Sequence, residues 1–140
     1  MSKISLRCRE CKKEYDSTFK YICDECFGPL DVHYDFPSIT KDTFTSREQT
    51  YWRYFELLPI IDKSNIVSIG AGMTPLVRAE KLGKEIGLSN LYIKNDSVNP
   101  TFSFKDRPAG VAVSKAKEFG LRSVGCASTG NLAAATAAHA

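Results

Sequence analysis

Two pairs of cysteines constrain the first part of this 140-residue chain more than any other feature of its sequence. Each pair has the form Cys-x-x-Cys, and eleven residues separate Cys8 and Cys11 from Cys23 and Cys26. Four thiolates at such a spacing can surround a Zn²⁺ ion tetrahedrally, which is the ligand set of a zinc ribbon. Because four thiolates leave no open position for a substrate, we expect a structural metal site. Two disulfides or free thiols are the alternatives.

A zinc-ribbon-like module is therefore expected over residues 1–36. Apolar and polar residues alternate in L-D-V-H-Y-D-F, residues 30–36, and predict a short strand that closes the module. His33 lies on the polar side of this alternation and is expected at the surface, since four cysteines already complete a tetrahedral site. Gly28 follows the second cysteine pair and helps the backbone turn around the metal, whereas the first pair lacks a comparable glycine. So short a module needs a metal because its own core is small.

The composition is that of a soluble globular protein, with 43% hydrophobic and 25% charged residues. The net charge of +3 is spread along the chain without a basic run, so nucleic acid is not an expected partner. The N-terminal residues lack an apolar stretch of signal-peptide length, and no segment is apolar enough to span a membrane, which predicts a cytoplasmic protein. An alanine-rich helix reaches the last residue without a C-terminal cap, which suggests a fragment of a longer protein.

Residues 37–65 are predicted to form a linker and a helical arm. The stretch 37–46 is rich in turn-forming residues, and a short helix is expected to begin at Ser46 and to end near Pro59. We expect the aromatic side chains of this arm to pack against the next domain rather than to bind a ligand. They are Tyr51, Trp52, Tyr54 and Phe55.

Residues 66–140 alternate between strand and helix patterns. The expected elements are a helix over 78–88, a strand over 90–94, a helix over 105–119, a strand over 123–127 and a helix from residue 131 onward. Gly120 would end the second helix, and Cys126 has the alternation of a buried strand residue. This order predicts an α/β fold in which helices flank a parallel sheet.

The segment N-P-T-F-S-F-K-D-R, residues 99–107, follows a predicted strand and opens a predicted helix. It places Lys105 between aromatic residues and at the positive end of a helix dipole, where a cation is mildly unfavourable. A lysine in partly apolar surroundings can act as a Schiff-base nucleophile or as a general base. The alternative is a solvated lysine in the first turn of a helix, which the dipole opposes by at most about 1 kcal/mol.

A second polar turn, S-T-G-N, occupies residues 128–131 before the last predicted helix. Free backbone N–H groups at a helix start attract anions, and the hydroxyls of Ser128 and Thr129 add donors. Together with Asn131 they could hold a substrate carboxylate or the polar edge of a cofactor. Ordinary N-cap residues are the alternative, since caps use the same residue types. Ligand sites in open α/β sheets lie at the carboxyl ends of strands, so this turn and Lys105 are expected at one edge of the sheet.

Several stretches together carry a resemblance to a known family. They are the ribbon-like start, W-R-Y-F-E-L-L-P-I at 52–60, N-I-V-S-I-G at 65–70, G-A-G-M-T-P-L at 70–76, N-P-T-F-S-F-K-D-R at 99–107 and A-S-T-G-N at 127–131. On these residues the sequence resembles the threonine synthase family of fold-type II pyridoxal-phosphate enzymes. S-F-K-D-R and S-T-G-N are shared with related enzymes such as threonine dehydratase. The resemblance covers nearly all of the chain but under half of a full enzyme.

The resemblance implies a role for each polar residue of the two turns. Lys105 would bind pyridoxal phosphate as a Schiff base, and Asn131 would hydrogen-bond the phenolic oxygen of the cofactor. Ser128, Thr129 and Gly130 would hold the α-carboxylate of an amino-acid substrate. The implied lyase reaction converts O-phospho-L-homoserine and water to L-threonine and phosphate, in a full-length enzyme expected to be a homodimer. Another fold-type II eliminase or β-replacement enzyme, and a catalytically inactive zinc-ribbon fragment, are the alternatives.

The chain departs from the family pattern at two positions beside the site. Ala71 stands between two glycines where family members usually have Glu, and Pro108 stands where glycine or another small residue is common. Either change could alter rate or substrate fit. The glycine-rich loop for the cofactor phosphate and the partner of the pyridine nitrogen would lie downstream of residue 140. We therefore expect the isolated chain to be inactive.

Overall fold

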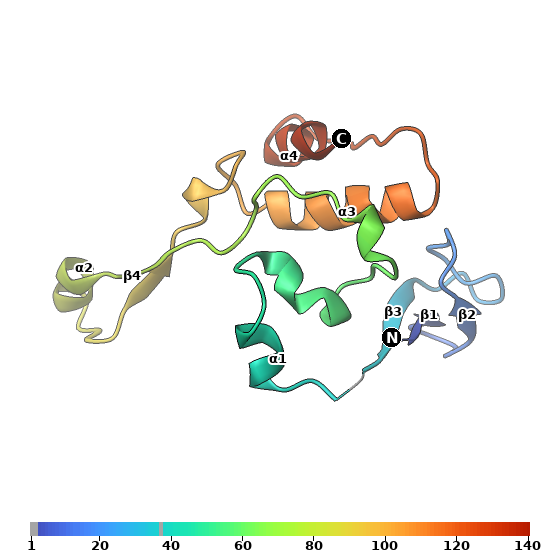
Figure 1. The fold of residues 1–140 in the computed structure, drawn as a ribbon, viewed down its shortest axis with the longest axis horizontal. Helices are drawn as coiled ribbons and strands as arrows, with labels where there is room; N and C mark the ends of the chain where they lie inside the picture. Colours follow the sequence, from blue (N-terminus) through green and yellow to red (C-terminus); the bar gives the residue numbers. More distant parts are fainter. Residues whose placement is uncertain (1–2, 37) are drawn as a thin grey trace.

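The computed structural model describes residues 3–36 and 38–140. Figure 1 shows an elongated arrangement with a three-stranded sheet at one end and the helices α3 (Asp106–Glu118) and α4 (Asn131–His139) in the middle. A smaller unit that contains β4 (Leu76–Arg78) projects at the other end. No helix in the described part of the chain combines the length and the apolar character needed to cross a membrane.

The first sheet holds three antiparallel strands in the order β2-β1-β3. Their bounds are Lys3–Cys8 for β1, Glu14–Asp16 for β2 and Leu30–Asp35 for β3. β1 is central, and its buried residue Leu6 lies opposite Tyr15 on one side and Val32 on the other. The strand predicted over 30–36 is thus confirmed, and His33 is exposed on it, as expected.

The arm differs from the prediction at its start. A five-residue helix, α1 (Lys41–Thr45), lies in the stretch expected to be linker, and the backbone N–H of Thr40 donates to the Thr43 hydroxyl at 3.2 Å. Because this capping contact starts a helix upstream, Ser46 ends α1 and does not begin the next helix, so the predicted cap is wrong. The following stretch forms the 3₁₀ helix η1 (Tyr51–Leu57) instead of an α-helix. Its aromatic residues lose side-chain freedom in an α-helix, which disfavours the regular form.

The arm supplies the largest apolar side chains of the core. Tyr51 and Trp52 pack with Ile60 and Ala71, and Val111 of α3 lies against this cluster. The arm therefore packs on the following segment, which confirms the expectation for Tyr51, Trp52 and Phe55. Tyr54 differs, because it is exposed and its ring lies against Phe44 of α1. Ala71 is 4% exposed, so a Glu side chain at this position would enter the core. Two more 3₁₀ helices follow along the chain, η2 (Lys63–Asn65) and η3 (Asp96–Val98).

The second sheet is a two-stranded antiparallel pair. β4 pairs with β5 (Tyr92–Lys94), and α2 (Glu80–Glu85) connects them, so the helix and strand predicted here are both present but shorter. Gly83 in α2 is buried, and a Cβ atom there would stand 2.4 Å from the carbonyl oxygen of Leu88. Glycine inside a helix is mildly unfavourable, but here a close backbone approach requires it.

The predicted parallel sheet does not occur in the described part of the chain, where both sheets are antiparallel. α3 matches the predicted helix, and Gly120, with φ of 69°, follows its end. Residues 121–127 then run exposed without forming a strand, so the strand predicted over 123–127 is wrong and Cys126 is exposed, not buried. A strand needs a neighbour for its backbone N–H and C=O groups, and no described segment pairs with this one.

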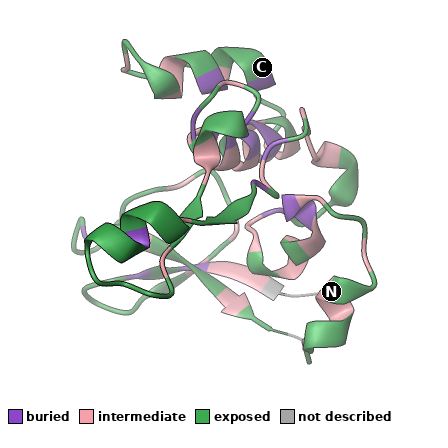
Figure 2. Cartoon of the chain, turned by 90° about the vertical axis from the view of Figure 1, so that its left-hand side faces the viewer, coloured by how far each residue is buried: buried purple, intermediate pink, exposed green. Residues whose placement is uncertain are grey.

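The predicted alanine-rich helix is α4, which lies across the first half of α3 (Figures 1 and 2). The buried residues of the two helices, purple in Figure 2, are mostly small, which lets the helix backbones approach closely. They are Asp106, Ala109, Gly110, Val113 and Ser114 in α3, with Ala135 and His139 in α4.

Candidate functional site

Lys105 is the residue that immediately precedes α3, with φ of −63° and ψ of −17°. Its side chain is half-buried, and its Nζ atom lies 4.7 Å from the centre of the Phe104 ring. Phe104 and Phe102 are 53% and 81% exposed, so the two aromatic residues do not enclose the amine in an apolar pocket. Among the described residues no carboxylate forms an ion pair with this amine. The amine is thus accessible to a ligand.

Buried polar side chains hold the loop before Lys105. Asn99 is 2% exposed, and its Oδ1 atom accepts from the N–H of Gly72 at 3.0 Å while its Nδ2 atom donates to the carbonyl oxygen of Asp96 at 2.9 Å. Ser103 is also buried, and its hydroxyl accepts from the N–H of Lys105 at 3.2 Å. These bonds connect the lysine loop to the glycine turn of G-A-G-M-T-P-L, which lies far from it in sequence.

An ion pair between Arg107 and Asp96 also joins the lysine loop to the segment around the glycine turn. The Arg107 guanidinium donates to both carboxylate oxygens of Asp96, at 2.8 and 2.9 Å, and to the Thr74 hydroxyl at 3.0 Å. The Thr74 hydroxyl in turn donates to Asp96 at 2.6 Å. The Arg107 guanidinium, and then the Thr74 hydroxyl, lower the pKa of Asp96 to about 2. A bidentate pair of this kind fixes orientation as well as distance.

Sequence reasoning missed Thr74, Asp96 and Asn99 as residues that shape this site. Thr74 and Asn99 lie within the motifs at 70–76 and 99–107, so their presence in these motifs was a usable signal. Asp96 had no such signal, because its partner Arg107 lies eleven residues further along the chain.

The S-T-G-N turn lies between α3 and α4, with Gly130 as the residue that precedes α4. Ser128 is half-buried, whereas Thr129, Gly130 and Asn131 are exposed. The Ser128 hydroxyl accepts from the N–H of Gly130 at 3.3 Å, and a Cβ atom at Gly130 would meet nothing within 4 Å. In the described part of the chain no hydrogen bond joins this turn to Lys105. The turn presents its hydroxyls and the α4 N-terminus to solvent.

The four paired cysteines come together at the end of the first sheet. Their Sγ atoms all lie within 4.8 Å of one another, with 3.4 Å between Cys8 and Cys26 and 3.5 Å between Cys11 and Cys23. Four sulfurs at 2.3 Å from a tetrahedral zinc ion would be about 3.8 Å apart. All four are free thiols. The cluster therefore has nearly the dimensions that a four-thiolate metal site requires.

Both cysteine turns have the same backbone geometry. The N–H of Cys8 donates to the carbonyl oxygen of Lys13 at 2.8 Å, and the N–H of Cys23 donates to that of Gly28 at 2.9 Å. The fourth residue after the first cysteine has a positive φ in each turn, 66° at Lys12 and 57° at Phe27. The first turn, which sequence reasoning took as the weaker one for lack of a glycine, thus adopts the left-handed conformation with Lys12.

Residues beyond the four sulfurs support the same arrangement. A Cβ atom at Gly28 would stand 3.1 Å from the Cys8 sulfur, so glycine leaves room for that thiol. The Tyr15 hydroxyl lies 3.0 Å from the Cys23 sulfur, and the N–H of Glu25 donates to this sulfur at 3.4 Å. The Tyr15 contact is the largest cause that lowers the pKa of Cys23, whereas contact with Cys26 raises the pKa of Cys11. Thiolate is the form of cysteine that binds metal.

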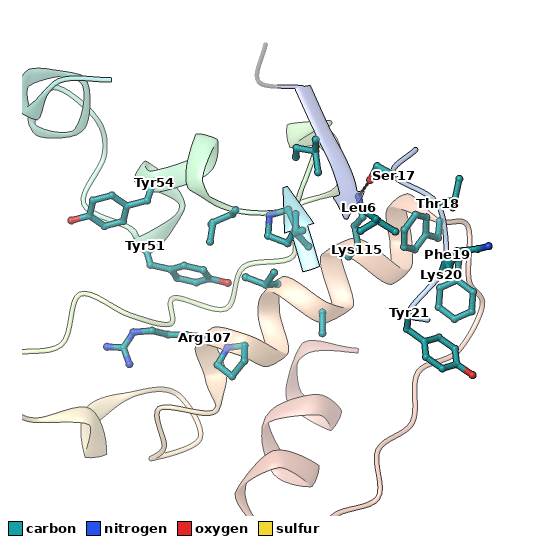
Figure 3. Close-up of a pocket in the computed structure, with 18 residues that line it drawn as sticks. Leu6, Ser17, Thr18, Phe19, Lys20, Tyr21, Tyr51, Tyr54, Arg107 and Lys115 are labelled. Carbon is teal, nitrogen blue, oxygen red and sulfur yellow. Dashed lines mark hydrogen bonds between the residues drawn. The ribbon is translucent and has the colours of Figure 1, made fainter. Parts of the chain in front are cut away.

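A separate, largely apolar groove of about 770 Å³ lies between the first sheet and α3 (Figure 3). Side chains from η1 and the loop of residues 17–21 lie on either side of it, with α3 beneath. The Lys115 amine donates to the Ser17 hydroxyl at 3.3 Å and so links α3 to the loop that follows β2. Lys105 and residues 128–131 do not line this groove, so the predicted cofactor site lies elsewhere on α3 and α4.

The two turns and the helices that carry them fall within a stretch that matches a known family. The family described as "Pyridoxal-phosphate dependent enzyme" matches residues 67–140, which include Lys105 and the S-T-G-N turn. The chain belongs to this family. The match begins just before the glycine turn and leaves out the cysteine cluster and the arm.

The chain is also similar to curated threonine synthases. It is 47% identical to the threonine synthase of Methanocaldococcus jannaschii over 138 residues, which cover 95% of this chain and 34% of that protein. It is 43% identical to that of Methanosarcina acetivorans over 137 residues, covering 96% of this chain and 33% of the relative. A match to the Halalkalibacterium halodurans threonine synthase, at 49% identity, covers 61% of this chain. The chain spans about a third of the length of the first two relatives.

Proposed function

We propose that this chain is the N-terminal part of a threonine synthase and that Lys105 carries its pyridoxal phosphate. The observation that carries the proposal is the accessible amine of Lys105, which lies at the start of α3 inside the segment that matches the pyridoxal-phosphate enzymes. The similarity to threonine synthases over nearly the whole chain supports this substrate class over others in the family.

The residues present fit such a cofactor. The amine of Lys105 has no carboxylate partner among the described residues, so it can condense with an aldehyde. The open N-terminus of α4, with space at Gly130, can receive an anionic or polar group. Asn131 would hydrogen-bond the phenolic oxygen of the cofactor, and Ser128, Thr129 and Gly130 would hold the substrate carboxylate.

The reaction would convert O-phospho-L-homoserine and water to L-threonine and phosphate. When bound, the cofactor withdraws electron density from the substrate's α-carbon. Lys105, once displaced by the substrate amine, would remove protons from Cα and Cβ as a general base and would return the proton at Cα as a general acid. The S-T-G-N turn would fix the carboxylate and so orient these carbons toward Lys105. Phosphate would leave from Cγ, which would take up a proton to become the methyl group, and water would supply the hydroxyl group at Cβ.

The full-length protein provides the test. We expect a yellow protein that releases phosphate from O-phospho-L-homoserine, and we expect Lys105→Ala to lose both colour and turnover. Lys117→Ala is a matched control, because Lys117 is an exposed lysine in α3, the helix that Lys105 precedes. Bound cofactor without phosphate release would favour the second candidate, another fold-type II eliminase or β-replacement enzyme. Loss of colour in neither variant would contradict the role of Lys105.

We also propose that the four paired cysteines hold a structural zinc ion. The proposal is supported by the spacing of their sulfurs and by the matching geometry of the two turns around Cys8 and Cys23. Four thiolates would fill the coordination sphere, so the ion would stabilise the first sheet and take no part in the reaction. A homodimer of the full-length protein remains our expectation for the assembly.

A further inference from the structure

We infer that Asp106 and His139 form a positioning pair that holds Lys105 in a defined place relative to the S-T-G-N turn; this inference rests on the proposed function. Asp106 directly follows Lys105 and begins α3, whereas His139 ends α4, the helix that begins with Asn131. The Nε2 atom of His139 lies 3.5 Å from Oδ1 of Asp106, and neither side chain is exposed to solvent.

The carboxylate of Asp106 also holds the lysine loop. Its Oδ2 atom accepts from the N–H of Thr101 at 2.8 Å, and its Oδ1 atom accepts from the Thr101 hydroxyl at 2.9 Å. A buried carboxylate is costly unless polar partners surround it. Within the described residues Thr101 supplies both hydrogen bonds to this carboxylate, and the Nε2 atom of His139 adds a polar contact at 3.5 Å that is longer than a hydrogen bond. The Asp106 side chain therefore contacts both the lysine loop and α4, the two segments that carry the proposed site.

α4 can approach so closely because Gly110 has no side chain. A Cβ atom at Gly110 would stand 2.9 Å from Cε1 of His139 and 2.4 Å from the hydroxyl oxygen of Tyr51. The Tyr51 hydroxyl and both ring nitrogens of His139 are buried and make no hydrogen bond within the described chain. Burial, and then the charge of Asp106, raise the pKa of Tyr51. The arm, α3 and α4 thus meet at one buried polar point beside Asp106.

The contact between His139 and Asp106 fixes the C-terminal end of α4, and because the helix is rigid it also fixes the position of the N-terminal end. Asn131 and His139 belong to one nine-residue helix, so they are about 12 Å apart along a rigid element. The S-T-G-N turn itself makes no hydrogen bond to Lys105 in the described part of the chain. The contact between Asp106 and His139 is therefore the polar interaction that positions α4 relative to Lys105.

The test measures attachment of the cofactor to Lys105 in the full-length protein. Pyridoxal phosphate is added over a range of concentrations, borohydride fixes it to the amine, and peptide mass spectrometry gives the labelled fraction of Lys105. For Asp106→Asn and His139→Ala we expect the concentration for half labelling to rise about tenfold. We expect kcat to fall by about 10- to 100-fold, with a smaller change in KM.

Two further variants separate positioning from a general loss of stability. His139→Gln keeps an N–H donor and is expected to recover most of the labelling, so an equal defect in His139→Gln and His139→Ala would overturn the inference. Glu118→Gln breaks the ion pair with Lys115 at the far end of α3, where the two atoms are 2.6 Å apart. It should lower stability while leaving the labelling of Lys105 unchanged.

The outcomes distinguish this inference from the proposed function. Folded Asp106→Asn and His139→Ala proteins that label Lys105 like the unmodified protein would overturn the positioning pair and leave the proposed function intact. If Lys105 of the unmodified protein takes no label at all, the proposed function fails and the inference fails with it.

Discussion

Asp96 and Arg107 form a two-point ion pair, with N–O distances of 2.8 and 2.9 Å, that ties the residues before the lysine loop to the first turn of α3. Since Lys105 lies between these two residues in the chain, the pair closes the loop that presents its amine. Asn99 makes a parallel connection to the glycine turn. The loop is thus closed by side chains and not by a sheet, and Phe102 and Phe104 remain exposed on it.

The Asp96–Arg107 pair predicts a pH-dependent contribution to stability. The partners lower the pKa of Asp96 from its ordinary value of 3.8 to about 2 in the folded protein. A carboxyl whose folded-state pKa is lowered stabilises the fold above its unfolded-state pKa, and this contribution is lost as the pH falls from about 4 to about 2. We expect Asp96→Asn to lower the free energy of unfolding at pH 7 by about 1 kcal/mol.

Urea unfolding of both proteins between pH 7 and pH 2 measures this effect. The difference between the unmodified protein and Asp96→Asn should be constant above pH 4 and should shrink below it. Glu80→Gln serves as the control, because Glu80 is an exposed carboxylate in a 3.9 Å contact with Arg78 and should contribute within about 0.5 kcal/mol. A difference that stays constant down to pH 2 would show that the pair does not set this pKa.

The two glycines around Ala71 give a matched comparison of backbone conformation and packing. Gly70 and Gly72 have nearly the same φ, 83° and 85°, where a side chain is strained. A Cβ atom at Gly72 would stand 2.8 Å from Cβ of Tyr51, whereas one at Gly70 would meet nothing within 4 Å. We expect Gly70→Ala to cost about 1–2 kcal/mol of stability. Gly72→Ala should cost a further 1–3 kcal/mol, roughly, because it overpacks the core.

Chemical denaturation of the two alanine variants measures both costs in the same protein. Equal losses of stability in the two variants would mean that the Tyr51 side chain moves aside at no cost in free energy. A larger loss in Gly72→Ala would support the close packing of the glycine turn against the arm.

Local signals in the sequence were sufficient to predict α3 and its end. The helix has a strong pattern, Asp106 favours its first turn, and Gly120 supplies a positive φ after its last residue. The prediction of a strand over 123–127 failed, because a strand depends on a partner elsewhere in the chain and local residue types do not reveal whether one exists. The pairing of β4 with β5 is likewise a property of two segments together.

In the candidate site, too, features with a local sequence signal could be predicted, whereas contacts between distant residues could not. The motif around Lys105 and the four cysteines could be recognised from residue types and spacing alone. The buried pair of Asp106 and His139 could not, since 33 positions separate the two residues and an alanine-rich helix gives no sign of a polar contact. Lys12 was missed for a related reason: its positive φ follows from the geometry of the cysteine turn and not from its residue type.

The 140-residue chain by itself is expected to release no phosphate from O-phospho-L-homoserine. It spans about a third of the threonine synthases of M. jannaschii and M. acetivorans, and the family's loop for the cofactor phosphate is expected downstream. A phosphate-release assay on the purified chain, with the full-length protein as the positive control, measures this directly. Turnover by the short chain would show that residues 1–140 already form a complete site.

The last prediction concerns the metal. Purified protein is expected to contain one zinc ion per chain, and Cys23→Ser should lose it, because serine cannot replace a thiolate in a four-sulfur site. Cys126→Ser is the matched control, since Cys126 is an exposed thiol outside the cluster. Elemental analysis gives the zinc content, and thermal unfolding with and without a chelator gives the accompanying loss of stability. Equal zinc content in both variants would exclude the cysteine cluster as the binding site, and a metal-free unmodified protein would contradict the proposal as a whole.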